Sequence, residues 1–230
     1  AAQTVDVMCS RAYDLGMDSI AVTDHGNLFA MLPFYQEAKK TGIKPILGCE
    51  IYVSVNDHQD KKQVTTANGK KWGYHHLVLL AQNLTGYQNL MKLCSIGYLA
   101  GFYYRPRVDK ALLKEFSEGL IATSGCLAGE VTAHAAAGDY DNAKKSALEY
   151  LEIFPDRFYL ELQNHDIPEE KKAHIILKKL STELNIPLVA TNDCHYSMKS
   201  DSDAHDVLFC LGTGKDRSDN NRMRYEPGKF

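Results

Sequence analysis

Short β-branched runs alternate with amphipathic stretches along nearly the whole chain, and this alternation constrains the fold more than any other feature. Regular alternation of this kind predicts an α/β fold in which helices cover a parallel sheet. The predicted strands are 19–23, 44–55, 76–81, 119–123, 157–162 and 186–191. The predicted helices are 5–15, 29–40, 84–98, a small-residue helix that ends near Gly138, 141–153 and 169–184. The first residues from Ala1 onward also suggest a helix that is already under way.

Polar residues at the strand ends decide between an open sheet and a barrel. An open doubly wound sheet concentrates its site at one switch point, whereas a barrel collects side chains from many strand ends. Here the first strand runs into 24–27, the second carries Glu50, the third begins with His75 and His76, the fourth ends at 124–126, and the sixth ends at 192–195. Residues so far apart in sequence can meet if the strands form a ring, so we expect a barrel.

The residue types at these ends are those of a metal site. Imidazole and thiolate suit zinc or iron, and carboxylates bridge ions or accept harder ones such as manganese. Asp193 and His195 are two residues apart, which places both side chains on one side of an extended segment. A mixed set of this size suits a cluster of two or three ions. Such a cluster activates water and clamps a phosphoryl group, so phosphoester hydrolysis is the expected reaction.

Other interpretations remain open for individual residues. For Asp24, a role in orienting His25 or capping the following helix is as well supported as metal ligation. His75 and His76 point to opposite faces of one strand, so only one of them is expected to be a ligand. For four further histidines, in loops or on helices, we expect surface positions; these are His58, His134, His165 and His174.

Composition excludes several classes of protein. With 44% hydrophobic and 24% charged residues the chain is neither disordered nor fibrous, and no apolar run reaches the length of a membrane span. The six cysteines are scattered and include no CxxC pair, which favours reduced thiols and a cytoplasmic location. A net charge of −3 means that DNA contact would require a local patch. Residues 101–107 mix aromatic residues with arginines. This combination is typical of a patch that binds a single strand of nucleic acid, and it is equally compatible with a loop that these side chains anchor to the protein.

Several segments together resemble the polymerase and histidinol phosphatase (PHP) domain, in the version found at the N-terminus of the alpha subunit of the bacterial replicative DNA polymerase III, a C-family polymerase. The segments are Thr23-Asp24-His25-Gly26-Asn27-Leu28, Gly48-Cys49-Glu50, 76–81 with 85–90, Ser124-Gly125-Cys126, and Thr191-Asn192-Asp193-Cys194-His195-Tyr196. Residues 101–107 and 203–208 resemble the polymerase version rather than the free-standing phosphatases.

This resemblance implies a distorted (β/α)7 TIM-like barrel with a trinuclear site of divalent ions, zinc, manganese or iron. The implied metal ligands are His25, Glu50, His76, Cys126, Asp193 and His195. It thereby selects His76 over His75 and implies catalytic roles for Asp193, His195 and His25 in metal-dependent 3′–5′ exonuclease activity on DNA. The implied partners are a DNA 3′ end, reached through the parent polymerase, and other replicative subunits, with no membrane. We expect a PHP domain over 1–211 and a connection towards a polymerase core over 212–230.

One part of the family pattern is absent from these residues. The family opens with a strand that carries a His-x-His motif, and the 230 residues contain none, so we expect that strand to lie outside them. Two other functions stay open: a non-catalytic scaffold stabilised by metal within the polymerase, and a free histidinol-phosphatase-like enzyme, which the polymerase-type segments weaken.

Overall fold

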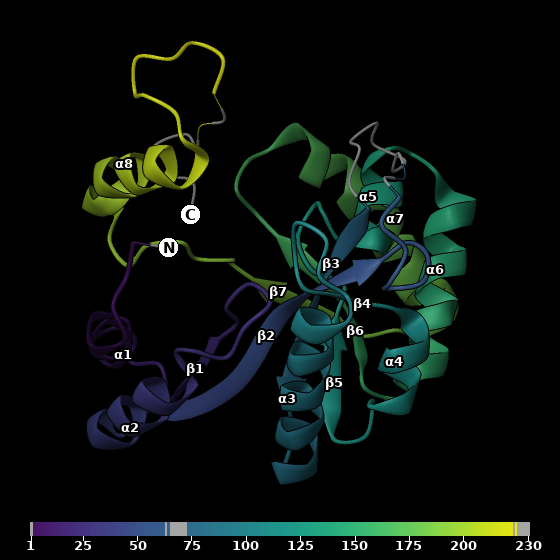
Figure 1. Cartoon of the computed structure of the whole chain (residues 1–230), viewed down its shortest axis with the longest axis horizontal. Coiled ribbons are helices and arrows are strands. Elements are labelled where there is room, and N and C mark those ends of the chain that lie inside the picture. The colour runs from purple at the N-terminus through teal and green to yellow at the C-terminus, as the bar shows by residue number, and fades with distance from the viewer. Residues whose placement is uncertain (1, 63, 65–72, 223, 225–230) are drawn as a thin grey trace.

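The chain forms an α/β structure in which helices alternate with the strands of one strongly curled sheet (Figure 1). The structure is a computed structural model and describes residues 2–62, 64, 73–222 and 224. The strands are β1 (Ser19–Val22), β2 (Lys44–Ser54), β3 (Tyr74–Ala81), β4 (Arg107–Val108), β5 (Leu120–Thr123), β6 (Phe158–Gln163) and β7 (Leu188–Thr191). The helices are α1 (Val5–Asp14), α2 (Met31–Thr41), α3 (Leu84–Leu99), α4 (Lys110–Glu115), α5 (Glu130–Ala136), α6 (Tyr140–Ile153), α7 (Pro168–Leu184) and α8 (Ser202–Thr213), with a 3₁₀ turn at Lys199–Asp201.

The six predicted strands are all present, and the structure adds three short or late elements. The additions are the two-residue strand β4, the short helix α4 and the helix α8. The expectation of a helix under way from the first residues is wrong, because α1 begins at Val5. Ala2 instead pairs with Tyr196, and Gln3 donates a hydrogen bond to the carbonyl of Cys194.

The strand order is β1-β2-β3-β5-β6-β7, with β4 added beside β2. Most neighbours are parallel, but β3 runs antiparallel to both β2 and β5, so the prediction of a fully parallel sheet is wrong at this strand. The physical reason is the connection. A parallel neighbour needs a crossover of about a dozen residues or more, usually helical, whereas a direct loop returns the chain antiparallel. The segment between β2 and β3 makes that return, and residues 63 and 65–72 of it lie outside the described part.

The reversed direction of β3 brings the polar strand ends together. Because β3 runs against its neighbours, its first residues lie at the edge of the sheet where the parallel strands finish. His76 is therefore opposite Tyr52 near the end of β2, and His25, just after β1, bridges Glu50. One mouth of the curled sheet thus receives the ends of parallel strands and the start of an antiparallel one.

The barrel prediction is confirmed as a curled half-barrel. Within the described residues, β1 pairs only with β2 and β7 only with β6, so these strands are the two edges. The larger core, which includes Leu79, Leu93 and Phe158, lies between the sheet and helices α3 to α7. A smaller core, which includes Cys9 and Phe34, joins α1 and α2 to the β1 edge. Over the described residues, we find no helix with both the length and the apolar character needed to cross a membrane.

Candidate metal centre

Three predicted ligands meet where β1, β2 and β3 come together. One ligand atom from each of His25, Glu50 and His76 lies within 4.8 Å of the other two. His25 Nδ1 is 3.6 Å from one oxygen of Glu50, and His76 Nδ1 contacts the other. The backbone fixes this arrangement, since Gly26 N donates to the Glu50 carbonyl and Glu50 N donates to the Asp24 carbonyl. Gly26 also has a φ of 66°, and a Cβ there would lie 2.8 Å from a Pro106 carbon, so the turn that presents His25 requires glycine.

Cys126 enters the same cluster from the loop after β5. Its Sγ is 3.6 Å from His76 Nδ1 and 4.0 Å from a Glu50 oxygen. The loop closes tightly, because Gly129 N donates to the Cys126 carbonyl and a Cβ on Gly129 would lie 1.9 Å from the Ser124 oxygen. A thiol, two imidazoles and a carboxylate therefore face one another.

Asp193 and His195 approach the cluster from the end of β7. The rings of His195 and His25 are 6.3 Å apart between centroids. His195 Nδ1 lies 2.8 Å from the carbonyl of Asp193, which can only accept, so Nδ1 carries the proton and the lone pair is on Nε2. The turn depends on Asp193, whose φ of 49° is a left-handed value that aspartate tolerates better than most residues.

Among the described residues, the basic groups around this cluster are histidines, and none is a lysine or an arginine. Burial by itself would raise the pKa of Glu50, but the hydrogen bond and charge of His76, with the charges of His25 and His195, lower it. Burial and the charge of Glu50 raise the pKa of the Asp193 carboxyl. Burial and the charges of Glu50 and Asp193 raise the pKa of the Cys126 thiol well above its usual value. Within the part of the chain that the structure describes, no Lys or Arg forms an ion pair with Glu50 or Asp193.

This donor set fits a divalent cation. Burial lowers the pKa of His25, outweighing the charge of Glu50, so its imidazole is neutral and able to coordinate. Carboxylate, neutral imidazole and thiol are the ligand types for zinc, manganese and iron. A cation among them would stabilise the ionised forms of Asp193 and Cys126 that the empty protein environment disfavours.

The structure shows which of His75 and His76 faces the cluster, and it excludes one of the roles considered for Asp24. His76 faces Glu50, whereas His75 is buried on the other side of β3, where its Nδ1 lies 3.4 Å from the Ala128 carbonyl. Asp24 does not cap the next helix, because the N-cap of α2 is Ala30.

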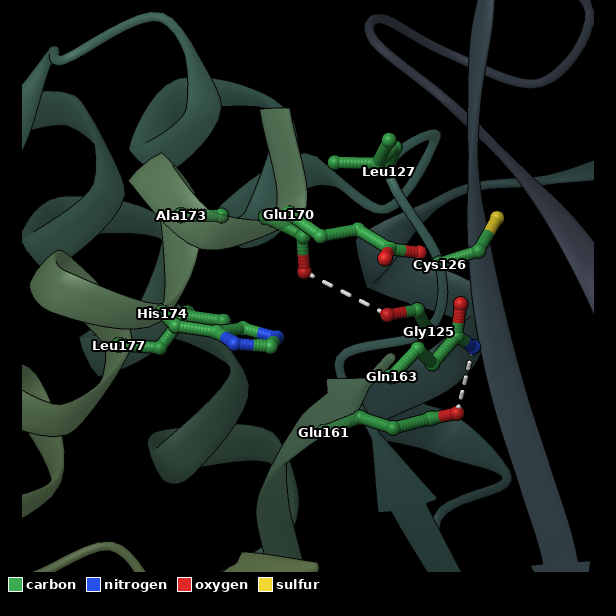
Figure 2. Close-up of a pocket in the computed structure, with 10 residues that line it drawn as sticks. Gly125, Cys126, Leu127, Glu161, Gln163, Glu170, Ala173, His174 and Leu177 are labelled. Atoms are coloured by element: carbon green, nitrogen blue, oxygen red, sulfur yellow. Dashed lines mark hydrogen bonds between the residues drawn. The ribbon is translucent and has the colours of Figure 1, made fainter. Parts of the chain in front are cut away.

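Glu161 is a buried carboxylate beside the centre that the sequence analysis missed. It lies on β6 and accepts hydrogen bonds from Thr123 of β5, Thr191 of β7 and Gln163. Figure 2 shows Glu161 and Gln163 with Gly125 and Cys126 on the lining of one pocket. An acidic residue inside the apolar alternation of Phe158–Gln163 was the available signal, because inward positions of a curled sheet repeat every second residue.

Three histidines assigned to the surface are largely buried, so that expectation is wrong for them. His134 has a side chain 18% exposed. His58 has a side chain 12% exposed and lies 2.6 Å from an Asp109 oxygen. His165 is 13% exposed and lies 2.7 Å from Glu170. The group of Asp57, His58 and Asp109 has the residue types of a cation site, but Asp109 caps α4 by accepting from Leu112 N and also accepts from His58 N. These hydrogen bonds give Asp109 a structural role, since it caps α4 and holds the backbone at His58 against it.

Comparison with known proteins identifies the family of the chain. The sequence profile described as "PHP domain" matches residues 1–165. The chain belongs to the PHP family. Among curated relatives, DNA polymerase III subunit alpha of Borreliella burgdorferi is 46% identical over 230 residues, which is 100% of this chain and 20% of that protein. The subunit of Thermus aquaticus is 43% identical over 212 residues, 92% of this chain and 17% of that protein. The chain therefore spans about a fifth of the length of these relatives.

Solved structures confirm the PHP-type fold at low sequence identity. A Bifidobacterium adolescentis protein designated a metal-dependent phosphoesterase superposes with a TM-score of 0.52 and 11% identity, over 85% of this chain and 83% of that one. An amidohydrolase from Chromobacterium violaceum gives the same TM-score and identity, over 84% and 83%. At this identity the likeness concerns the fold alone.

Proposed function

We propose that this PHP chain is a metal-dependent phosphodiesterase that removes nucleotides from the 3′ end of DNA. The observation that carries the proposal is the convergence, at one mouth of the sheet, of acceptor groups without a protein cation among the described residues. The proposed ligands of two or three ions of zinc, manganese or iron are His25, Glu50, His76, Cys126, Asp193 and His195. When bound, such ions supply Lewis acidity towards phosphoryl oxygens and make hydroxide available at neutral pH.

The protein's own groups orient and exchange protons at this mouth. The hydrogen bond from Nδ1 to the Asp193 carbonyl fixes the orientation of the His195 ring. Nε2, on the other side of the ring, is then the nitrogen able to coordinate. His25 has a side chain 49% exposed, which places it where substrate would enter, and its lowered pKa keeps the ring neutral, as a ligand must be. Because the pKa of Asp193 is raised, a bound cation would displace a proton from this carboxyl and hold it in the ionised form.

The wider setting is proposed from the relatives. The curated proteins that the chain matches are DNA polymerase III alpha subunits, so we infer that it acts within a replicative polymerase in the cytoplasm, with DNA and the other polymerase subunits as partners. In this proposal, 1–211 is the PHP domain and 212–230 leads towards the remainder of the polymerase.

The test is the variant His195→Ala in the full-length protein, assayed for release of nucleotides from a 3′-labelled single strand with Mn²⁺ or Zn²⁺. We expect activity to fall about a hundredfold or more, because a ligand and its orientation are lost together. The melting temperature is expected to stay within a few degrees of wild type. Unchanged activity would contradict the role proposed for His195. A wild type without nuclease activity, together with a large fall in melting temperature for the variant, would instead indicate the metal-stabilised scaffold.

A further inference from the structure

The segment between α3 and β4 displays aromatic rings to solvent beside an arginine. Tyr104 is 71% exposed and Phe102 49% exposed, and Arg105 is exposed as well. The rings are ordered by their neighbours: Phe102 stacks on Tyr98 at 6.1 Å between centroids, and Tyr103 meets Tyr104 edge-on at 4.6 Å. Single exposed aromatics are ordinary on protein surfaces, but neighbouring ones in one short segment mark a contact surface.

The base of this segment is firmly anchored. The Arg107 side chain, 1% exposed, donates to the carbonyls of Gly101, His58 and Asp60. Above this anchor, Tyr103 N donates to the Arg105 carbonyl, which closes a tight turn. Tyr104 occupies the tip with a φ of 61°, a left-handed value that a bulky residue rarely adopts. Glycine would suit that backbone better, and the ring contact of Tyr104 is with its neighbour Tyr103, so backbone energy does not explain a tyrosine at the tip.

The segment forms part of the rim of the metal centre. The Arg105 guanidinium lies 5.9 Å from the centroid of the Tyr52 ring. That same ring is 5.3 Å from the ring of His76 and 6.2 Å from the ring of His25. Pro106 packs against the Gly26 turn, as the close approach at Gly26 shows. Arg105 is thus separated from two proposed ligands by a single aromatic ring.

We propose that Tyr104 and Arg105 bind a single-stranded nucleic acid as it leads into the mouth, with Tyr104 stacking on a base and Arg105 contacting a phosphate. Exposed rings beside a cation are the combination that holds single strands without reading their sequence. No carboxylate of the described residues pairs with Arg105, so its charge is available to an anionic partner. The direction of the strand, with its 3′ end at the metal centre, rests on the proposed function; the binding surface does not.

The experiment measures fluorescence anisotropy of a labelled oligothymidylate of about 12 nucleotides with the full-length protein in EDTA, where no hydrolysis occurs. For Tyr104→Gly we expect an affinity about tenfold lower, although glycine relieves the left-handed backbone and should leave the melting temperature unchanged or higher. Tyr104→Trp keeps a stacking face and should retain wild-type affinity. Arg105→Gln should weaken binding and reduce the salt dependence by about one phosphate contact.

Tyr13→Ala is the matched control, since Tyr13 is 64% exposed on α1 and should leave the affinity unchanged. Wild-type affinity in Tyr104→Gly and Arg105→Gln would overturn the proposal. So would a melting temperature lowered by Tyr104→Gly, since the ring would then be packing against other parts of the protein. Binding is measured without metal, so it is independent of nuclease activity. If the wild type binds the strand at this surface but releases no nucleotides, the proposed nuclease function is wrong and the proposed binding surface stands.

Discussion

Two buried carboxylates of this molecule have opposite surroundings. Glu130, at the start of α5, is closed by groups of the protein: Lys110 Nζ is 2.8 Å from one oxygen, and Tyr150 and Ser146 donate to the same carboxylate. Glu50, at the mouth, faces imidazoles and a thiol. Both have a lowered pKa despite burial, Glu130 through Lys110 and Glu50 through His76. Glu130 thus has a lysine of the protein beside it, whereas we propose that Glu50 takes a cation from solution.

The largest expected effect is on the cluster of Glu130 with Lys110, Tyr150 and Ser146. Lys110→Met leaves the charge of Glu130 without its cation, so we expect the free energy of unfolding to fall by about 3 kcal/mol, equally with and without added metal. Urea unfolding measures it. Lys114→Met is the matched control, because the pair of Lys114 with Glu152 is exposed and should be worth less than about 1 kcal/mol. A metal-dependent effect of Lys110→Met would remove the distinction between the two carboxylates.

The second effect concerns the cluster of Glu50 with His25, His76 and Cys126. Here the change in stability should depend on added metal. In EDTA, Glu50→Gln should cost some stability, because the lowered pKa of Glu50 means that the folded protein stabilises its ionised form through His76. Wild type should gain about 2.7 kcal/mol at a hundredfold excess of metal over the dissociation constant, and the variant should lose most of that gain. Melting curves with and without Mn²⁺ or Zn²⁺ give both values. An equal gain in the two proteins would place the cation elsewhere.

The smallest effect is a pH dependence near the β7 end of the mouth. His165 Nδ1 is 2.7 Å from a Glu170 oxygen and Nε2 is 2.6 Å from the Asn192 carbonyl, and both partners are acceptors. Burial lowers the pKa of His165, but the bonds to Glu170 and Asn192 outweigh it and the pKa is raised. A raised folded pKa adds stability that is complete below the unfolded value of about 6.5 and is lost as pH rises through the folded value.

The variant His165→Gln should therefore cost about 1 kcal/mol of unfolding free energy below about pH 6.5 and progressively less above it. Urea unfolding at a series of pH values measures this difference. His174→Gln, on α7, is the control, because it removes a histidine and leaves the bonds of His165 to Glu170 and Asn192 in place. A cost for His165→Gln that stays constant across this range would mean that the neutral ring holds the Asn192 loop equally well.

The two clusters differ in how far the sequence predicted them. His25, Glu50, His76 and Cys126 lie at strand ends in recognisable motifs, and the structure brings them together. The reversal of β3, which puts His76 at that edge, depends on how the chain connects β2 to β3 and is not encoded in the strand itself. Glu161, Lys110 and Glu130 have most of their partners 16 or more residues away, and such pairs leave no periodic signal. The roles of the six proposed ligands stay predictions.

The central claim is that the carboxylate at the mouth takes its cation from solution, and metal content tests it most directly. Wild type, Glu50→Gln and Lys110→Met would be loaded with Mn²⁺ or Zn²⁺, dialysed and analysed by inductively coupled plasma mass spectrometry. We predict that wild type and Lys110→Met retain the same amount, at least one ion per chain, and that Glu50→Gln retains much less. Wild-type protein without any retained metal, or equal retention by Glu50→Gln, would contradict the account.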